Sequence, residues 1–224
     1  MTSSNVYCIE PLAQGSSSAL SQIAWDNISA LDVASVHPRS SSHTPKTSVR
    51  VAYDSDALYL KFQVEDQYVC CRHLEHQSQV CEDSCVEAFL KPVANKGYFN
   101  FEINVSGVML VYYVADNTPT PDGFKDHTIL SEAQLQQIQI LSDHQRAIDP
   151  EISEPLSWSI ICRIPRTVFE DYLGPLTLGP DSPWQGNFYK CADQSSHPHW
   201  MSWNPVGEVL NFHKPECFGQ LQFS

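Results

Sequence analysis

Short runs of alternating apolar and polar residues constrain the fold of this sequence more than any other feature. The clearest run is YFNFEINV (98–105), and in the segment 49–66 two such stretches flank the turn residues Asp54-Ser55-Asp56. Alternation with a period of two is typical of β-strands with one buried face. Further runs predict strands at 84–90, 108–114, 138–141, 157–164 and 184–192.

Helical periodicity is scarce. Two segments predict short helices: SEAQLQQ (131–137), with Ser131 as the cap, and PRTVFEDYL (165–173). Segments rich in turn-forming residues are expected to be loops. These segments are 35–47, 116–127 and 142–155.

Many short strands joined by turns are typical of β-sandwiches and jelly rolls. The 224 residues contain no internal repeat and no dividing linker, and all-β domains commonly reach this length. We therefore expect an all-β fold: one jelly-roll-like β-sandwich domain over residues 1–224, with one or two short helices. About 20 residues at the N-terminus are expected to be partly irregular.

The formal net charge of −13 restricts the partners and the location of the chain. An acidic surface repels phosphate backbones and anionic membranes, so nucleic acid is not an expected partner. No apolar run is long enough to span a membrane, and the first residues lack the pattern of a signal peptide. The chain as written is expected in the cytoplasm, and outside the cell if further residues precede it.

Eight cysteines are expected to be reduced in the cytoplasm, most of them as small apolar residues in strands. One short segment gathers six side chains of the kinds that bind metals: Cys70, Cys71, His73, His76, Cys81 and Cys85. The Cys81-x3-Cys85 spacing supplies only half of a zinc motif. Structural zinc is therefore an alternative rather than the main expectation.

The strand 98–105 has two unlike faces, because successive strand side chains point to opposite sides. The apolar face is expected in the core: Phe99, Phe101, Ile103 and Val105. The polar face consists of Tyr98, Asn100, Glu102 and Asn104. It either faces solvent or forms a platform for a hydroxyl-rich ligand, because amide and carboxylate groups match sugar hydroxyls.

Glu87 lies inside the short strand run SCVEAFL. Burial of an unpaired carboxylate is costly, so Glu87 is expected either to face solvent or to pair with Lys190 or Arg163. A glycoside hydrolase also needs two carboxylates, and Glu87, Glu102 and Asp83 are the candidates for acid and base. A glycoside hydrolase is therefore the enzymatic alternative.

Seven motifs follow one another along residues 20–224. They are AYDSDALYLKFQVED, VCEDSCVEAFLKP, YFNFEINVSG, WSIICRIP, WQGNFYKCAD, PHWMSWNP and FHKPECFGQLQF. This ordered set resembles the family 9-like carbohydrate-binding modules of the DOMON-like β-sandwich superfamily. The resemblance implies a non-catalytic module that holds a terminal sugar between two tryptophans, with polar groups around the hydroxyls. It also implies that calcium is a possible cofactor.

By this resemblance, Trp203 falls on one sugar-stacking tryptophan and Glu87 on a sugar-contacting glutamate. Three positions depart from the family pattern. Cys81 replaces the second tryptophan, Glu102 replaces an arginine, and Lys190 replaces a glutamine. The expected ligand-binding set is Trp203, Glu87, Lys190, Glu102, Asn104, Asp193 and His213.

The five tryptophans are expected to have different roles. Trp203 is interpreted as the exposed stacking platform for a sugar, with a plug at the end of the core as the alternative. Trp200 is expected to be buried rather than to bind sugar, and so are Trp25, Trp158 and Trp184.

A haem- or metal-binding domain is a third functional alternative, because other DOMON-like domains carry haem on Met and His ligands. The residues available for this are Met109, His199, Met201 and His213.

Overall fold

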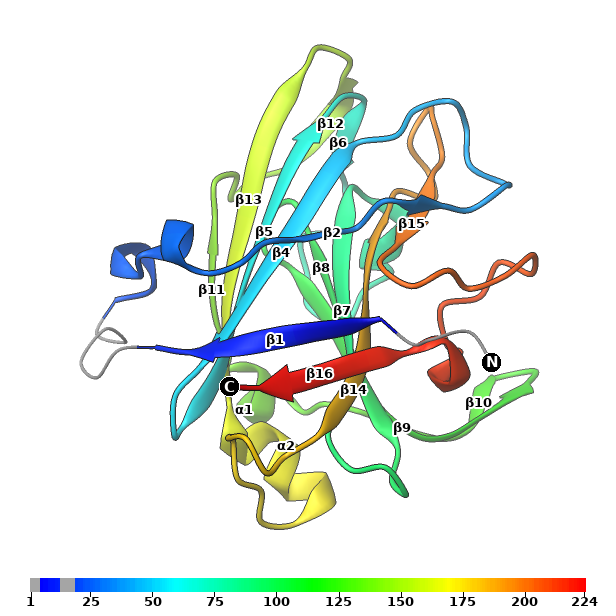
Figure 1. Cartoon of the computed structure of the whole chain (residues 1–224). Helices are drawn as coiled ribbons and strands as arrows, with labels where there is room; N and C mark the ends of the chain where they lie inside the picture. Colours follow the sequence, from blue (N-terminus) through cyan, green and yellow to red (C-terminus); the bar gives the residue numbers. More distant parts are fainter. Residues whose placement is uncertain (1–4, 13–18) are drawn as a thin grey trace.

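The computed structural model describes residues 5–12 and 19–224, in which strands predominate (Figure 1). The expected all-β fold is confirmed, and the alternating runs form the strands. The strands of this part of the chain are β1 Val6–Pro11, β2 Leu31–Asp32, β3 Ser35–Val36, β4 Lys46–Tyr53, β5 Ala57–Asp66, β6 Val69–Cys71, β7 Cys85–Lys91, β8 Tyr98–Asn104, β9 Met109–Thr120, β10 Gly123–Ile129, β11 Gln139–Ser142, β12 Ile148–Ile152, β13 Leu156–Pro165, β14 Trp184–Cys191, β15 Trp200–Ser202 and β16 Gly219–Phe223.

Both predicted helices form, and they lie at the lower end of the molecule in Figure 1. Ser131 caps α1 (Glu132–Leu135) through a reciprocal pair of hydrogen bonds with Gln134. Pro165 precedes α2 (Arg166–Leu173), which buries Val168 and Phe169. Short 3₁₀ turns are η2 Leu20–Gln22, η3 Trp25–Asn27, η4 Val80–Glu82 and η5 Pro215–Cys217. Among the described residues, no helix has the length and apolar character needed to cross a membrane.

Most of the strands form one strongly curled sheet in two layers, and β6 and β12 form a separate two-stranded sheet. The first layer runs β10-β9-β8-β7-β14-β16, and the second runs β4-β5-β13-β11. β1 joins the layers, because it pairs in parallel with β16 on one side and with β4 on the other. The N-terminal segment, expected to be irregular, thus supplies this joining strand. The remainder of that segment, residues 1–4 and 13–18, lies outside the described residues.

The core fills the space between the two layers. Phe101 and its same-face neighbours on β8 are buried there, as their alternation predicted. The Phe62 ring of β5 meets the Phe188 ring of β14 with centroids 6.2 Å apart. Trp158 and Trp184 are buried in this core, and Trp25 is buried in a second apolar cluster, so these three expectations are confirmed.

All three expected loops contain strand residues, so these predictions were wrong in part. Segment 35–47 begins with β3 and ends with the first two residues of β4. β9 and β10 form a hairpin across most of segment 116–127, with the turn at Pro121-Asp122-Gly123. Gly123 has a φ of +119°, which other residues rarely adopt. β12 pairs with β6 inside segment 142–155. β10 and β12 pair near the edges of sheets and carry mostly exposed polar residues. Their sequences therefore show no alternation that would have predicted strands.

A buried ion pair links the two layers. Lys190 on β14 is fully buried, and its Nζ lies 3.4 Å from Asp66 Oδ2 on β5. Trp158 Nε1 and His43 Nε2 also bond the Asp66 carboxylate. Burial opposes ionisation, but the Lys190 charge and the His43 hydrogen bond hold the pKa of Asp66 well below its usual range.

His199 completes this network. Its Nε2 lies 2.8 Å from Lys190 Nζ. Burial and the neighbouring Lys190 charge lower the pKa of His199 to about 3, so the ring is neutral and accepts the hydrogen bond.

We expect Lys190→Met to lower the free energy of unfolding by about 3–5 kcal/mol at pH 7, because it leaves Asp66 buried without its cation. Urea unfolding measures this change. Lys46→Met, in an exposed pair with Glu65, is the control and should change the stability little, because solvent screens this pair. If Lys190→Met changed the free energy of unfolding as little as Lys46→Met, the Lys190–Asp66 pair would not stabilise the fold as described.

Candidate functional site

The first layer has a second buried face, turned away from the core. On this face Glu87 of β7 lies directly opposite Glu102 of β8 and directly opposite Tyr189 of β14. Glu87 and Glu102 are only 3% and 6% exposed. The expectation of a solvated outer face is therefore wrong at these positions.

The cover over this face comes from distant parts of the sequence. Residues 204–218, named here the cover segment, bring Val206, Phe212 and Phe218 against Phe89 and Tyr189. η4 adds Val80 from the other side. The face is therefore enclosed without contributing to the core between the layers.

A cavity of about 270 Å³ lies between the sheet face and its cover. It is lined by Cys81, Glu87, Phe89, Glu102, Cys191, Asp193, Trp200, Leu210, Phe212 and His213. Its polar wall holds three carboxyl groups and neither lysine nor arginine.

The two central carboxyls have different hydrogen-bond partners. Glu87 Oε1 accepts from Cys191 Sγ at 3.1 Å. Glu102 Oε1 accepts from Asn100 Nδ2 at 2.7 Å. Glu102 Oε2 is buried and has no partner within the described structure. Because such an atom is costly to leave unsatisfied, Glu102 Oε2 is the strongest ligand acceptor in the cavity.

Burial also changes the titration of this site. Desolvation and the facing Glu102 raise the pKa of Glu87 well above its usual range. Desolvation raises the pKa of Glu102 to about 7. Burial lowers the pKa of His213 to about 4, so its imidazole is neutral at pH 7. The cavity therefore offers neutral donors and acceptors as well as carboxylate near neutral pH.

Aromatic side chains form the rest of the wall. Trp200 Nε1 donates to Asp193 Oδ1 at 2.7 Å, which fixes the indole at the cavity. The Phe212 ring stacks on Tyr189, with centroids 4.1 Å apart and planes 14° apart. Both Trp200 and Phe212 are half-buried, so each retains exposed aromatic surface.

Four of the seven residues predicted for the site line this cavity: Glu87, Glu102, Asp193 and His213. Trp203 lies elsewhere, packed against the core with its ring 6.0 Å from Phe188. Asn104 is fully buried, and its Nδ2 donates to Asp83 Oδ2 and to the His73 carbonyl. This bonding gives Asn104 a structural role at the end of β8.

The predicted Glu87–Lys190 pair does not form. In the β7–β14 ladder, Glu87 lies opposite Tyr189 and Lys190 opposite Val86. Lys190 therefore points into the core, where it bonds His199, and Glu87 points into the cavity. The two charges lie on opposite faces of the sheet.

The cavity also contains residues that sequence reasoning did not assign to ligand binding. Trp200 was expected to be buried, and it is instead half-buried in the cavity wall. The alternation of side chains along a strand was the available signal. Trp200 lies opposite Cys191, and Trp203, three residues further on, therefore points to the other face. Phe212 carried no such signal, since it lies in the cover segment outside any strand.

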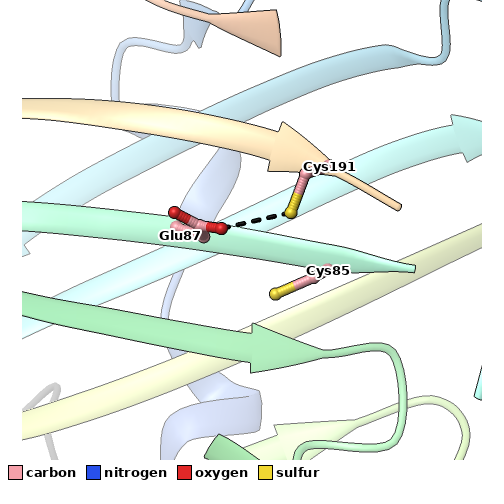
Figure 2. A group of neighbouring side chains, drawn as sticks. All are labelled: Cys85, Glu87 and Cys191. Carbon is pink, nitrogen blue, oxygen red and sulfur yellow. Dashed lines mark hydrogen bonds between the residues drawn. The ribbon is translucent and has the colours of Figure 1, made fainter. Parts of the chain in front are cut away.

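The metal-ligating residues predicted at 70–85 do not gather. Cys71 Sγ bonds Ser106, and His73 Nε2 bonds Glu82. One compact set does exist in the described part of the chain: Cys85, Glu87 and Cys191, whose ligand atoms lie within 4.8 Å of one another. Figure 2 shows the Glu87 carboxylate directed toward the Cys191 sulfur, with Cys85 beside them.

Haem and calcium are the other cofactors that the sequence suggested. Met109 and Met201 are buried in the core, and His199 bonds Lys190 there, whereas His213 lies in the outer cavity. These residues therefore do not form one haem site. Within residues 5–12 and 19–224, the one compact group of His, Cys, Asp or Glu ligand atoms contains a single carboxylate, that of Glu87.

Comparison with known proteins identifies the family. The chain matches the sequence profile of carbohydrate-binding family 9 over residues 18–223. The chain belongs to carbohydrate-binding family 9. The expectation of a non-catalytic carbohydrate-binding module is thereby confirmed. The family 9 module has no significant match among curated proteins.

Solved structures share the fold of this family 9 module. A Bacteroides uniformis protein assigned provisionally to carbohydrate binding is 26% identical, with a TM-score of 0.87 over 99% of this chain and 100% of its own. A Caldicellulosiruptor kristjanssonii family 9 module in complex with glucose is 11% identical, with a TM-score of 0.58 over 98% and 96%. A Caldicellulosiruptor kristjanssonii family 9 module in complex with cellotriose is 14% identical, with a TM-score of 0.54 over 98% and 94%.

The family also decides between binding and catalysis. Glu87 and Glu102 do face each other, as the glycoside hydrolase alternative requires. The third candidate, Asp83, is occupied by the backbone N–H groups of Arg72 and His73. Family 9 is a family of carbohydrate-binding modules, so the family match favours carbohydrate binding over hydrolysis.

We expect Glu102→Gln to stabilise the family 9 module at pH 8 by about 3 kcal/mol more than at pH 5. The folded-state pKa of about 7 lies above the ordinary 4.5, so the wild type loses stability as pH rises through 7. Glutamine does not ionise and avoids this loss. Urea unfolding in metal-free buffer, with the exposed Glu154→Gln as control, measures the difference. A gain that does not grow with pH would contradict this account of Glu102.

Proposed function

We propose that the cavity beneath the cover segment is the sugar site and that it takes one terminal ring of a neutral carbohydrate. The observation that carries this proposal is the unpartnered, buried Glu102 Oε2 in a cavity with an aromatic wall. A sugar needs both features, because its C–H face is apolar and its hydroxyls donate hydrogen bonds. The volume of about 270 Å³ is at the lower end for ligand pockets, which favours a single ring.

In this proposal, aromatic residues contact the apolar face of the sugar and polar residues bond its hydroxyls. Trp200 and Phe212 supply flat apolar surface, and the Asp193 hydrogen bond holds the Trp200 indole in place. Glu102 and Glu87 accept from hydroxyls, and His213 lines the same space with its Nδ1 held by Tyr98 at 2.8 Å. In this arrangement Trp200 takes the stacking role that the sequence motif suggested for Trp203.

The charge of the wall restricts the ligand. Three carboxyl groups line the cavity without a lysine or an arginine. An anionic sugar would be repelled by any of these groups that is ionised, and would favour their protonation, which lowers its affinity relative to a neutral sugar. Glucose is the first probe, because a Caldicellulosiruptor kristjanssonii family 9 module is known in complex with it.

We expect Trp200→Ala to lower the affinity for a neutral sugar by roughly thirtyfold, on the order of 2 kcal/mol, as for a hot-spot tryptophan. Isothermal titration calorimetry with glucose and cello-oligosaccharides measures this loss. Trp203→Ala is the matched control: it should lower thermal stability through lost core packing and leave the affinity unchanged. Loss of affinity in Trp203→Ala, with none in Trp200→Ala, would overturn the assignment.

We expect glucose to bind at least about tenfold more tightly than glucuronate at pH 7.5, because the carboxyl wall repels an anion. Glu102→Gln should narrow this ratio by removing one of the charges. The same calorimetric titration gives both affinities. Equal affinities in the wild type would show that the carboxyl wall does not face the sugar.

A further inference from the structure

Two thiols lie directly opposite each other on the outer sheet face, and one of them, Cys191, lines the cavity. Cys85 of β7 and Cys191 of β14 form a cross-strand pair on the outer sheet face. They are 0% and 1% exposed, and both are free thiols. Residues directly opposite in an antiparallel pair have Cβ atoms about 4.5–5.5 Å apart, so both sulfurs can reach one bound atom.

Glu87 joins this pair on the same face. It is two residues from Cys85 along β7, and its Oε1 lies 3.1 Å from Cys191 Sγ. The two sulfurs and a Glu87 oxygen all lie within 4.8 Å of one another. In Figure 2 the three side chains converge from two strands, as the ligands of one ion would.

The chemistry of these donors selects a thiophilic ion. Two thiolates and one carboxylate suit Zn²⁺, which is most often tetrahedral, and do not suit Ca²⁺ or Mg²⁺. Rigid strands hold all three donors, and the paired strands fix their spacing. A divalent cation would also offset the negative charge gathered here, where the cavity lining has no lysine or arginine.

We propose that Cys85, Cys191 and Glu87 form a binding site for a thiophilic divalent cation such as Zn²⁺ beside the cavity. Glu87 and Cys191 line the cavity, so the ion enters by the same opening. Cys81 and Glu102 line it as well and are the side chains available for a fourth position. The metal site shares Glu87 with the proposed sugar site, whereas Trp200, Phe212 and His213 belong to the sugar site alone.

Cobalt substitution tests the site directly. The full chain is reduced, freed of metal with a chelator, and titrated with Co²⁺, whose thiolate bonds give a near-ultraviolet charge-transfer band. We expect saturation at one Co²⁺ per chain and displacement by one Zn²⁺. Cys85→Ser and Cys191→Ser should each lose about half of the band and bind at least about tenfold more weakly.

The controls separate this site from general thiol chemistry. Cys162→Ser removes a buried thiol on β13, in the other layer, and should leave the cobalt band unchanged. Glu87→Gln retains both thiols, so its band should persist with weaker binding, even where a serine variant fails to fold. A wild type without the band, or a band that both serine variants retain in full, would overturn the proposal. Trp200→Ala should lose affinity for glucose and still bind Zn²⁺. This result would show that the metal site does not depend on sugar binding.

Discussion

Glu87 and Glu102 face each other across β7 and β8 on a side of the sheet that the core does not use. Two carboxyl groups in direct opposition, both nearly excluded from water, are tolerated only when protons, hydrogen bonds or a ligand compensate them. The cover segment creates this condition by enclosing the face, and its Lys214 bonds the Val206 and Val209 carbonyls instead of lining the cavity. The cavity and its unpartnered Glu102 oxygen follow from that enclosure, and the proposed preference for neutral ligands rests on it.

Successive side chains of β14 point to opposite faces of the first layer. This strand therefore contributes to the ion pair in the core on one face and to the candidate site on the other. Lys190 points into the core and bonds the Asp66–His199 network that joins the layers. Its neighbours Tyr189 and Cys191 point the other way, toward Glu87. One strand thus carries a structural ion pair on one face and part of the candidate site on the other. Removal of the ion pair should therefore affect stability and leave the site chemistry unchanged.

The sequence predicted the strands where one face was apolar. The alternation in YFNFEINV correctly placed Phe101 in the core and Glu102 on the opposite face. Alternation does not reveal what covers a polar face, and the cover segment shows no period because it contains almost no regular structure. The burial of Glu102, and with it the cavity, therefore required the three-dimensional structure.

The tryptophans show a second limit of sequence reasoning. Motif resemblance selected Trp203, but the register of β15 against β14 decides which indole shares a face with Glu87, and that register places Trp200 there. Lys190 was misplaced for the same reason, because its orientation depends on its partner strand β7. Residue identity indicated the right segments, and pairing register assigned the roles.

A crystal structure of the chain with glucose at saturating concentration would locate the bound sugar. We expect one sugar ring in the cavity, packed against Trp200, with a hydroxyl within hydrogen-bond distance of Glu102 Oε2. A sugar bound at Trp203 or elsewhere on the surface, with the cavity empty, would contradict this expectation.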